Sequence, residues 1–426
     1  MLSLNPMISA LSYKRTLVAA GLFFGSMTLS AQVVSGAHEN GDKNMNQKSL
    51  IYNILKGKSP IFDSVIYGST DRRVQVLYTR IERDKNGRPH FEEHGYRSNP
   101  DEYFYPASTV KLPVAILALQ RLNELGIAGL DMNTTMLTDS ASPEQTPVLG
   151  DRSAADGRPT IAHYIKKILL VSDNDAYNRL FEFLGPDYIN ETLHRLGYAN
   201  TELVHRLSLP LTMAQNRHTN PVRFLDAHGT LLYEKPAAIS QRQIPEREIK
   251  LGTGYLSGGK LVHAPFDFSF KNRFPLSDLH RVVRSVLFPE SLPKKQRFNL
   301  TANDLAFLRK YMSMLPGESD DPQYNTTDYW DTYVKFLYYG SEKNTYDPNI
   351  RVYNKVGDAY GFLIDGAYFH DVKNNIEFLL SAVIYCNSDG IFNDDKYDYD
   401  AVGFPFMKEL GRAIYQYQRS RSKMED

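Results

Sequence analysis

Apolar residues follow two different periods along this chain, and each period predicts a type of element. Apolar and polar positions alternate over 73–79 and again over 90–96, with the turn pair Asn86-Gly87 between them, which predicts a β-hairpin. A short helical stretch precedes the hairpin at 50–55. Farther along, apolar residues three and four positions apart predict helices over 161–171, 175–184 and 188–196.

The pattern changes again in the second half of the chain. From about 235 to 348 the sequence is rich in glycine and aromatic residues, with two helical stretches at 276–287 and 303–314. Strand patterns return over 350–353, 361–370 and 376–385, and an amphipathic helix follows over 402–417. Strands near both ends with helices between them predict a two-lobed α/β (α+β) fold. We expect an antiparallel sheet with flanking helices and an inserted all-helical lobe.

One stretch places a reactive side chain at the start of a buried helix. Ser108 precedes the apolar run 112–119, and the free N–H groups and dipole of a helix start favour developing negative charge. Lys111 follows three residues later, so both side chains share one face. An amine whose pKa is lowered by burial and by other cations can take the proton of a serine hydroxyl. Ser108 is therefore a candidate nucleophile with Lys111 as its base. The same spacing at 291–294 and 420–423 does not open an apolar helix.

A second polar motif follows the predicted helix at 161–171. In Ser172-Asp173-Asn174, the hydroxyl of Ser172 could relay a proton to a leaving nitrogen, and the amide of Asn174 could hold a substrate amide. Ser, Asp and Asn are also the preferred helix-capping residues. The two roles are compatible, so we retain both.

A third motif precedes the predicted strand at 361–370. Lys355 would bind a substrate carboxylate and help to lower the pKa of Lys111, and Gly357 would let a substrate backbone approach the strand edge. A rival Lys-x-Gly begins at Lys250, but it leads into a glycine-rich loop instead of a strand. We therefore favour Lys355.

These three motifs, in this order, resemble those of the serine β-lactamase and penicillin-binding protein superfamily, which are Ser-x-x-Lys, Ser-Asp-Asn and Lys-Thr-Gly. The likeness is greatest to the class A β-lactamase catalytic domain. Residues 172–197 are similar to the helix after its second motif, and Arg206-Leu207 with 219–221 resembles the frame of its omega loop. The resemblance covers about 60–235 and 350–420.

The resemblance implies a β-lactamase/transpeptidase-like fold with the site between the lobes. It implies catalytic roles for Ser108, Lys111 and Ser172, and substrate-binding roles for Asn174, Lys355, Gly357 and Asp358. The backbone N–H groups of Ser108 and Asp358 would form the oxyanion hole.

The implied activity is that of a secreted serine hydrolase that opens β-lactam or related amide bonds through an acyl-Ser108 intermediate. Such an enzyme takes a β-lactam or a peptidoglycan peptide as substrate, needs no cofactor or metal, and can confer antibiotic resistance. We expect a monomer. The expected units are a signal peptide at 1–37 and one catalytic unit at 38–426, which comprises an α/β lobe (about 60–105 plus 350–426), a helical lobe (about 106–235) and an accessory insertion (about 236–348).

The sequence departs from the family pattern in ways that affect the chemistry. No acidic residue occurs in 203–225, so the omega-loop glutamate that activates the hydrolytic water of class A enzymes is missing and slow deacylation is expected. His205 and His218 are the titratable bases there; His205 is the better candidate, although a structural role is favoured for it. Val356 replaces a hydroxyl residue that helps to hold a substrate carboxylate. Asp358 places a negative side chain beside the oxyanion hole, where it could repel a substrate's charge.

Composition and the N-terminus restrict the partners and the compartment. Lys+Arg and Asp+Glu both number 49, so the net charge of zero favours neither nucleic acid nor an anionic membrane surface. The eleven histidines show no ligand spacing, so no metal is expected.

Lys14-Arg15 followed by the apolar segment 16–31 is typical of a secretory signal, which predicts a periplasmic protein; an uncleaved anchor is the alternative. Cys386, the single cysteine, is expected to be a buried thiol.

Two other functions remain open. The chain could be a D-alanyl-D-alanine carboxypeptidase or transpeptidase-like peptidase, or a non-catalytic binding protein that retains the fold. The insertion raises a further question, since its aromatic cluster either lines the access to the site or packs an accessory layer. The members of that cluster are Phe266, Phe268, Phe270 and Phe274.

Overall fold

The computed structural model describes residues 49–67, 71–143 and 145–425, with side chains up to Arg421. The expected signal peptide at 1–37 lies outside the described residues. Among the helices of the described part, none is both long and apolar enough to cross a membrane.

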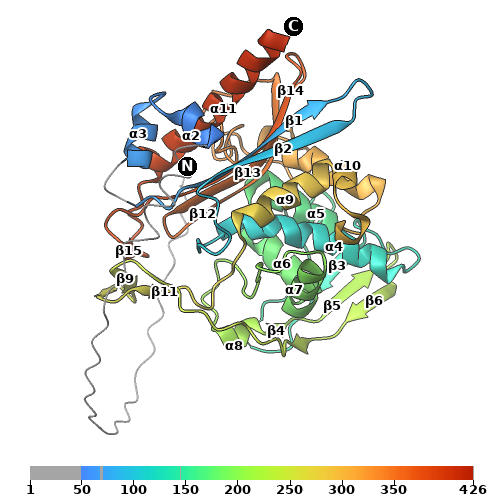
Figure 1. The fold of residues 1–426 in the computed structure, drawn as a ribbon. Coiled ribbons are helices and arrows are strands. Elements are labelled where there is room, and N and C mark those ends of the chain that lie inside the picture. Colours follow the sequence, from blue (N-terminus) through green and yellow to red (C-terminus); the bar gives the residue numbers. More distant parts are fainter. Residues whose placement is uncertain (1–48, 68–70, 144, 426) are drawn as a thin grey trace, which may run out of the picture.

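A five-stranded antiparallel sheet forms the centre of the fold (Figure 1). Its strands, in spatial order, are β12 (Ile350–Ala359), β13 (Phe362–Asp371), β14 (Ile376–Tyr385), β1 (Gln75–Arg83) and β2 (Pro89–Tyr96). The N-terminal hairpin therefore joins the three C-terminal strands, with Thr79 opposite Leu379. The strand β12 lies at the edge of the sheet. Cys386, one residue beyond β14, is a buried free thiol, as expected.

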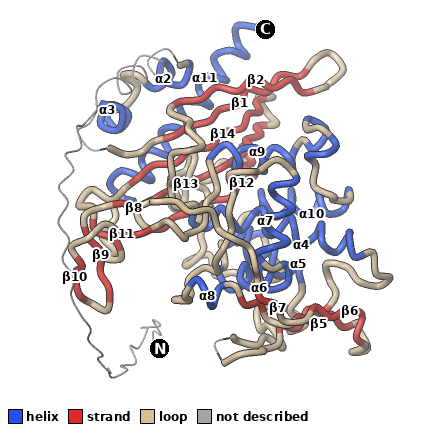
Figure 2. Tube along the Cα trace, turned by 60° about the horizontal axis from the view of Figure 1, so that its bottom comes forward, coloured by secondary structure: helices blue, strands red, loops and turns tan. Residues whose placement is uncertain are grey.

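Alternate residues of β13 enter two separate apolar cores, because successive side chains point to opposite faces of a sheet. Phe362 and Ile364 pack in one core with α9 (Leu276–Leu287). Leu363 packs in the other core with α11 (Phe404–Glu425). The second core also includes α2 (Leu50–Leu55) and α3 (Pro60–Tyr67), whereas α10 (Ala302–Ser313) packs against β12 (Figure 2). Both faces of the sheet are thus covered.

The middle lobe shares the core that contains α9. Its helices are α4 (Lys111–Leu125), α5 (Ile161–Val171), α6 (Asn174–Leu184), α7 (Pro186–Arg195) and α8 (Met213–Asn216). It also contains short strands that the sequence pattern did not predict, β3 (Thr135–Thr138), β4 (His218–Thr219), β5 (Val222–Leu225), β6 (Leu231–Lys235) and β7 (Ala238–Ile239). The first ten residues of α4 are buried, as its continuous apolar run requires.

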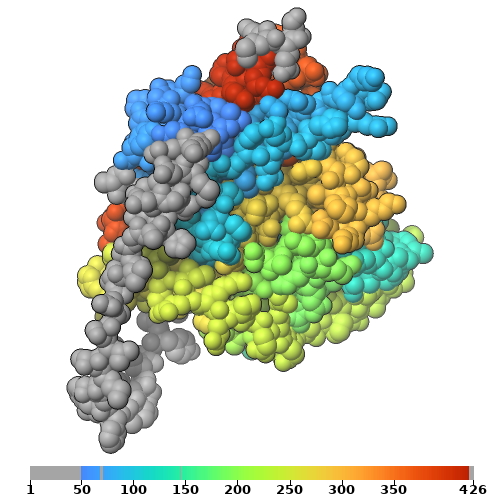
Figure 3. All heavy atoms as spheres, viewed as in Figure 1, coloured from blue at the N-terminus to red at the C-terminus, as the bar shows by residue number. Residues whose placement is uncertain are grey.

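The segment 236–348 is part of the main body of the fold. It supplies β8 (Lys250–Leu251), β9 (Gly254–Ser257), β10 (Lys260–Val262) and β11 (Phe266–Asp267), and β9 pairs with β15 (Ile391–Phe392) near the C-terminus. It also supplies α9 and α10, which lie between the hairpin β1–β2 and the middle lobe; in Figure 3 their gold surface separates the blue hairpin from the green lobe. The two-lobed α+β architecture expected from the sequence is confirmed, and this segment fills the junction between the lobes.

Candidate active site

Ser108 lies in a single 3₁₀ turn, Ala107–Val110, that leads directly into α4. Ala107 has a left-handed backbone (φ 47°), and both the N–H and the hydroxyl of Thr109 donate to Pro106 O, which closes the turn. Thr109 and Val110 are buried, whereas Ser108 is partly accessible. The turn therefore presents the Ser108 hydroxyl at the mouth of a rigid buried helix.

Lys111 is fully buried directly behind this turn. Its Nζ donates to Ser172 O, to Ser172 Oγ at 3.3 Å and to Asn174 Oδ1 at 2.6 Å. Burial and the nearby Lys355 hold the pKa of Lys111 well below its ordinary value, against the opposite influence of two carboxylates. Ser108 Oγ has no hydrogen-bond partner among the residues that the structure describes. Such contacts often form only when substrate binds.

The connection between α5 and α6 places the second motif. Ser172 ends α5 with a left-handed backbone (φ 61°), and the Asp173 carboxylate caps α6 by accepting from Ala176 N at 2.8 Å. This tight connection directs Ser172 and Asn174 to Lys111. Capping is thus carried out by Asp173, which leaves the two flanking side chains available for the site.

Lys355 completes a chain of hydrogen bonds behind Ser108. Its Nζ donates to Ser172 Oγ at 2.8 Å and to Val356 O at 2.9 Å. Burial lowers the pKa of Lys355 to about 7, although nearby carboxylates raise it. The hydroxyl of Ser172 is therefore shared by two buried lysines, Lys111 and Lys355.

The structure corrects the bounds of the strand at the third motif and gives a packing reason for its glycine. The predicted strand at 350–353 continues to Ala359, so Lys355-Val356-Gly357 lies within β12, directly before β13. A Cβ at Gly357 would lie 2.9 Å from both Pro106 O and Ser108 N. Glycine is therefore required because the edge strand packs against the turn that carries Ser108. The expected approach of a substrate backbone to Gly357 stays a prediction.

Asp358 lies at the surface of the cleft, beside this turn. Its carboxylate makes no hydrogen bond or ion pair with any residue in the described part of the chain. It is accessible from the cleft, yet the protein atoms that surround it raise its pKa, against the lowering influence of Lys355 and Lys111.

Two cavities adjoin Ser108, and both are lined by Ser108, Asn174 and Asp358. The first has a volume of about 560 Å³ and is also lined by Ser172, Trp330, Tyr333, Glu342 and Asp400. The second has a volume of about 410 Å³ and is also lined by Tyr105, Leu207, Ser208, Tyr360 and Asp395. Substrate can therefore reach Ser108 from two sides.

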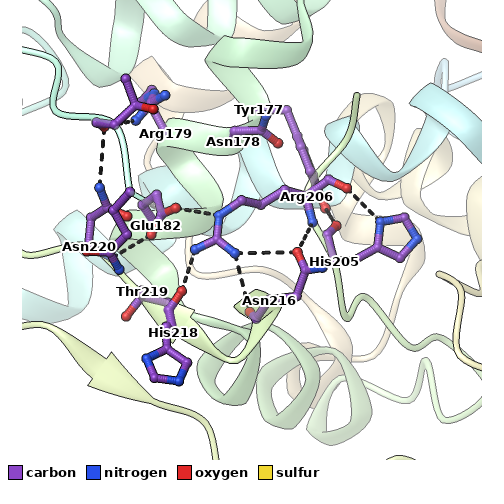
Figure 4. Close-up of polar contacts among 12 residues, drawn as sticks. Tyr177, Asn178, Arg179, Glu182, His205, Arg206, Asn216, His218, Thr219 and Asn220 are labelled. Atoms are coloured by element: carbon purple, nitrogen blue, oxygen red, sulfur yellow. Dashed lines mark hydrogen bonds and ion pairs between the residues drawn. The ribbon is translucent and has the colours of Figure 1, made fainter. Parts of the chain in front are cut away.

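The loop that resembles an omega loop is held by a buried ion pair. Figure 4 shows Arg206 directed at Glu182 of α6, with its other nitrogens donating to His218 O and to Asn216. Glu182 Oε2 accepts from Asn220 N at 2.6 Å. A separate cavity of about 260 Å³ adjoins this ion pair. These contacts fix both ends of the loop to α6.

The two histidines of this loop do not reach the cavities beside Ser108. His205 stacks on Tyr105, with ring centroids 6.1 Å apart, its Nδ1 bonds Arg206 O at 2.6 Å, and burial lowers its pKa to about 4. His218 lines the separate cavity beside Glu182. Neither histidine lines the cavities that contain Ser108.

The structure also places residues in the site that the sequence did not indicate. Ser208 accepts from Asn174 Nδ2 at 2.8 Å and lines the second cavity, but a lone serine in a loop gives no signal of this position. Trp330, Tyr333 and Glu342 come from an irregular stretch of the insertion. Within the described residues, no group of three or more His, Cys, Asp or Glu side chains is placed to hold a metal ion.

Comparison with protein families gives a match that agrees with this geometry. Residues 65–237 match the model of the β-lactamase enzyme family. The matched stretch contains Ser108, Lys111 and 172–174, and it ends before Lys355. The resemblance to the serine β-lactamase and penicillin-binding protein superfamily is confirmed, and the fold is β-lactamase/transpeptidase-like. A match to this family suggests serine hydrolase activity on a small-molecule substrate.

Solved structures with a similar fold include two β-lactamases and a protein described as PBP-A. The β-lactamase from Sphaerobacter thermophilus is 16% identical, with 86% of this chain and 96% of that chain covered and a TM-score of 0.45. The β-lactamase from Xanthomonas campestris pv. campestris is 13% identical, with 88% and 97% covered and a TM-score of 0.44. PBP-A is 15% identical, with 88% and 95% covered and a TM-score of 0.46. Comparison with curated proteins gives no match.

Proposed function

We propose that this protein is a serine hydrolase that opens a β-lactam or related amide bond through an acyl-Ser108 intermediate. The observation that carries the proposal is the hydrogen-bond chain from Lys111 through Ser172 to Lys355 behind an accessible serine. Burial and the neighbouring Lys355 keep the pKa of Lys111 low, so its amine can be neutral at a pH where a free lysine is charged. The export signal expected at 1–37 would place this chemistry outside the cytoplasm.

In the acylation step, neutral Lys111 takes the proton of Ser108, and the serine oxygen forms a bond to the amide carbon. The carbonyl oxygen becomes an oxyanion, for which the backbone N–H groups of Ser108 and Asp358 are the candidate donors. When the C–N bond breaks, Ser172 passes a proton from the lysine pair to the departing nitrogen. The acyl group remains on Ser108.

Deacylation is proposed to be slow. The second step needs a water activated by a base, and such assistance contributes typically about 10²–10⁴-fold to the rate. The loop 203–225 contains no acid, and His205 and His218 lie away from the cavities beside Ser108. The acyl-enzyme is therefore expected to accumulate.

Two departures from the family favour a second candidate, a non-catalytic binding protein. Val356 removes a donor for a substrate carboxylate, and Asp358 adds a negative charge beside the candidate oxyanion hole. A D-alanyl peptidase-like activity would use the same chemistry as the primary proposal and differs from it only in the substrate. Acylation of Ser108 separates the catalytic proposals from the non-catalytic one.

The test is rapid mixing with a chromogenic cephalosporin, followed by measurement of the mass of the intact protein. We expect a burst of about one product per protein, a mass increase on Ser108, and turnover much slower than that of an efficient β-lactamase. Ser108→Ala should abolish both burst and mass increase at unchanged melting temperature. Fast turnover without a burst would contradict slow deacylation. If neither this probe nor a fluorophosphonate acylates Ser108, the non-catalytic candidate is preferred.

A further inference from the structure

The charges around Ser108 are distributed unevenly between the cavity surfaces and the layer behind them. Among the described residues that line the two cavities, none is a lysine, arginine or histidine, whereas four are carboxylates. These four are Glu342, Asp358, Asp395 and Asp400. The two lysines of the site are buried behind the surface, against Ser172. A substrate that enters therefore meets an acidic surface.

The larger cavity combines this charge with aromatic side chains. Asp400 is exposed and has no ion pair or hydrogen bond within the described part of the chain. Glu342 pairs with Lys408 through Oε1, at 2.6 Å. Trp330 and Tyr333 line the same cavity with their rings 5.0 Å apart, edge to face. Aromatic faces and carboxylates both attract cations.

Trp330 and Tyr333 form an aromatic wall of this cavity, and hydrogen bonds within the chain hold the wall in place. Trp330 Nε1 donates to Ser341 O at 2.8 Å, and the buried Asp365 carboxylate accepts from the N–H groups of Phe336 and Leu337. The Lys343 ammonium lies 4.7 Å from the centre of the Trp330 ring, so this ring attracts a cation, and a ligand ammonium must use its other face or displace Lys343. A preformed wall costs less ordering entropy when a ligand binds.

A negatively charged substrate group is disfavoured in the same cavity. A penicillin or cephalosporin carries a carboxylate near its scissile amide, and here that group would meet Asp358 with no hydroxyl at Val356 to hold it. Like charges in a partly desolvated cleft repel. We propose, as an extension of the proposed function, that the natural acyl donor is an amide that carries an ammonium group and has no carboxylate next to the scissile bond. Asp400, Glu342 and the Trp330 wall recognise the ammonium group.

Matched thioesters test this charge preference, because they are reactive stand-ins for an amide and their thiol release is easily followed. The first series is the benzyl thioesters of N-acetyl-lysine, N-acetyl-norleucine and N-acetyl-glutamate. A second series carries the ammonium, neutral or carboxylate group on the leaving thiol. In at least one series we expect the ammonium member to acylate Ser108 about tenfold faster than the neutral member, with the carboxylate member slowest. Added salt should reduce this ratio.

Variants assign the preference to the cavity. Asp400→Asn should lower the ratio of ammonium to neutral rates at least about threefold, and Asp400→Asn with Glu342→Gln should bring it close to one. Asp320→Asn, an exposed carboxylate of the same insertion outside both cavities, should leave the ratio unchanged. Equal rates in both series, or faster reaction of the carboxylate members, would overturn the inference while Ser108 acylation leaves the proposed function standing.

If none of these compounds acylates Ser108, a binding measurement tests the charge preference instead. Titration calorimetry with N-acetyl-lysinamide and N-acetyl-norleucinamide then measures the preference without chemistry. Tighter binding of the lysine amide, lost in Asp400→Asn and kept in Asp320→Asn, supports the inference even though the proposed reaction has failed. Equal affinity of the two amides overturns it.

Discussion

At the scale of single residues, the site depends on two buried lysines that cannot both be ordinary cations. Burial and the charge of Lys355 hold the pKa of Lys111 well below its ordinary value, whereas burial, with a further contribution from Lys335, lowers the pKa of Lys355 to about 7. Ser172 bonds both amines and can pass a proton between them. The protonation states of these two amines therefore set the reactivity of Ser108.

This coupling predicts how acylation depends on pH. The rate with a neutral fluorophosphonate should rise as Lys111 loses its proton, at a pH well below the ordinary lysine range, and should decline as Lys355 deprotonates above about pH 7. Lys355→Met removes the cation that lowers the pKa of Lys111, so the rising limb should move to higher pH and the decline should disappear. At any pH below the rising limb, each pH unit of this movement costs about tenfold in neutral Lys111.

The exposed Lys250, which belongs to the rival Lys-x-Gly and pairs with Glu248, supplies the control. Lys250→Ala should leave the pH profile of labelling unchanged. A rising limb at the same pH in wild type and Lys355→Met would show that Lys355 does not act on Lys111.

At the scale of elements, α6 links the site to the loop that follows it. One end of α6 carries Asn174 in the site, and Glu182 near its other end holds Arg206. Leu207 and Ser208 lie next to Arg206 and line the second cavity. The ion pair therefore positions a wall of the cleft, although it lies outside both cavities that contain Ser108.

Breaking this ion pair should affect both stability and the cleft. Both side chains are 4% exposed, and removal of one partner from a buried pair typically costs about 3–5 kcal/mol because the other charge stays buried. Glu182→Gln should lower the free energy of unfolding in urea by about that amount and slow the acylation of Ser108. Asp139→Asn is the matched control: it breaks the partly exposed pair with Arg223, and we expect a cost of about 1 kcal/mol or less. Similar losses in both variants would contradict a special role for Glu182.

At the scale of the whole molecule, the local pattern of apolar and polar residues predicted most of the helices and strands and indicated the three motifs of the candidate site. The helices α5 and α9 and the strand β14 have the predicted bounds, because their apolar periods are long and uninterrupted. Ser108 and Lys111 could be recognised because they open an apolar helix. The reason for Gly357 could not be predicted, since it depends on Pro106, some 250 residues earlier in the chain. The acidic cavity surface was also missed, because Glu342 lies in an irregular stretch and Asp400 in the short π-helix Tyr399–Gly403, and only the fold brings them together.

The aromatic cluster of the insertion shows the same limit, and it provides the last prediction. The structure gives its two central members different environments: Phe268 is fully buried against Tyr103, Tyr105 and Tyr360, whereas Phe270 is 46% exposed, and neither lines the cavities beside Ser108. Of the two alternatives left open by the sequence, packing therefore describes Phe268, and neither ring lines the cavities beside Ser108. Tyr105 and Tyr360 line the second cavity instead, with Phe268 packed behind them.

Single substitutions should consequently separate the two rings. Phe268→Ala should cost about 3–5 kcal/mol of unfolding free energy, the usual loss for a buried aromatic ring, and should slow Ser108 acylation because Tyr105 and Tyr360 lose their support. Phe270→Ala should change stability by no more than about 0.5 kcal/mol and leave acylation unaltered. Urea unfolding and fluorophosphonate labelling, at a temperature where both variants are folded, provide the measurements. Equal losses in the two variants would mean that the insertion does not support the cleft through Phe268.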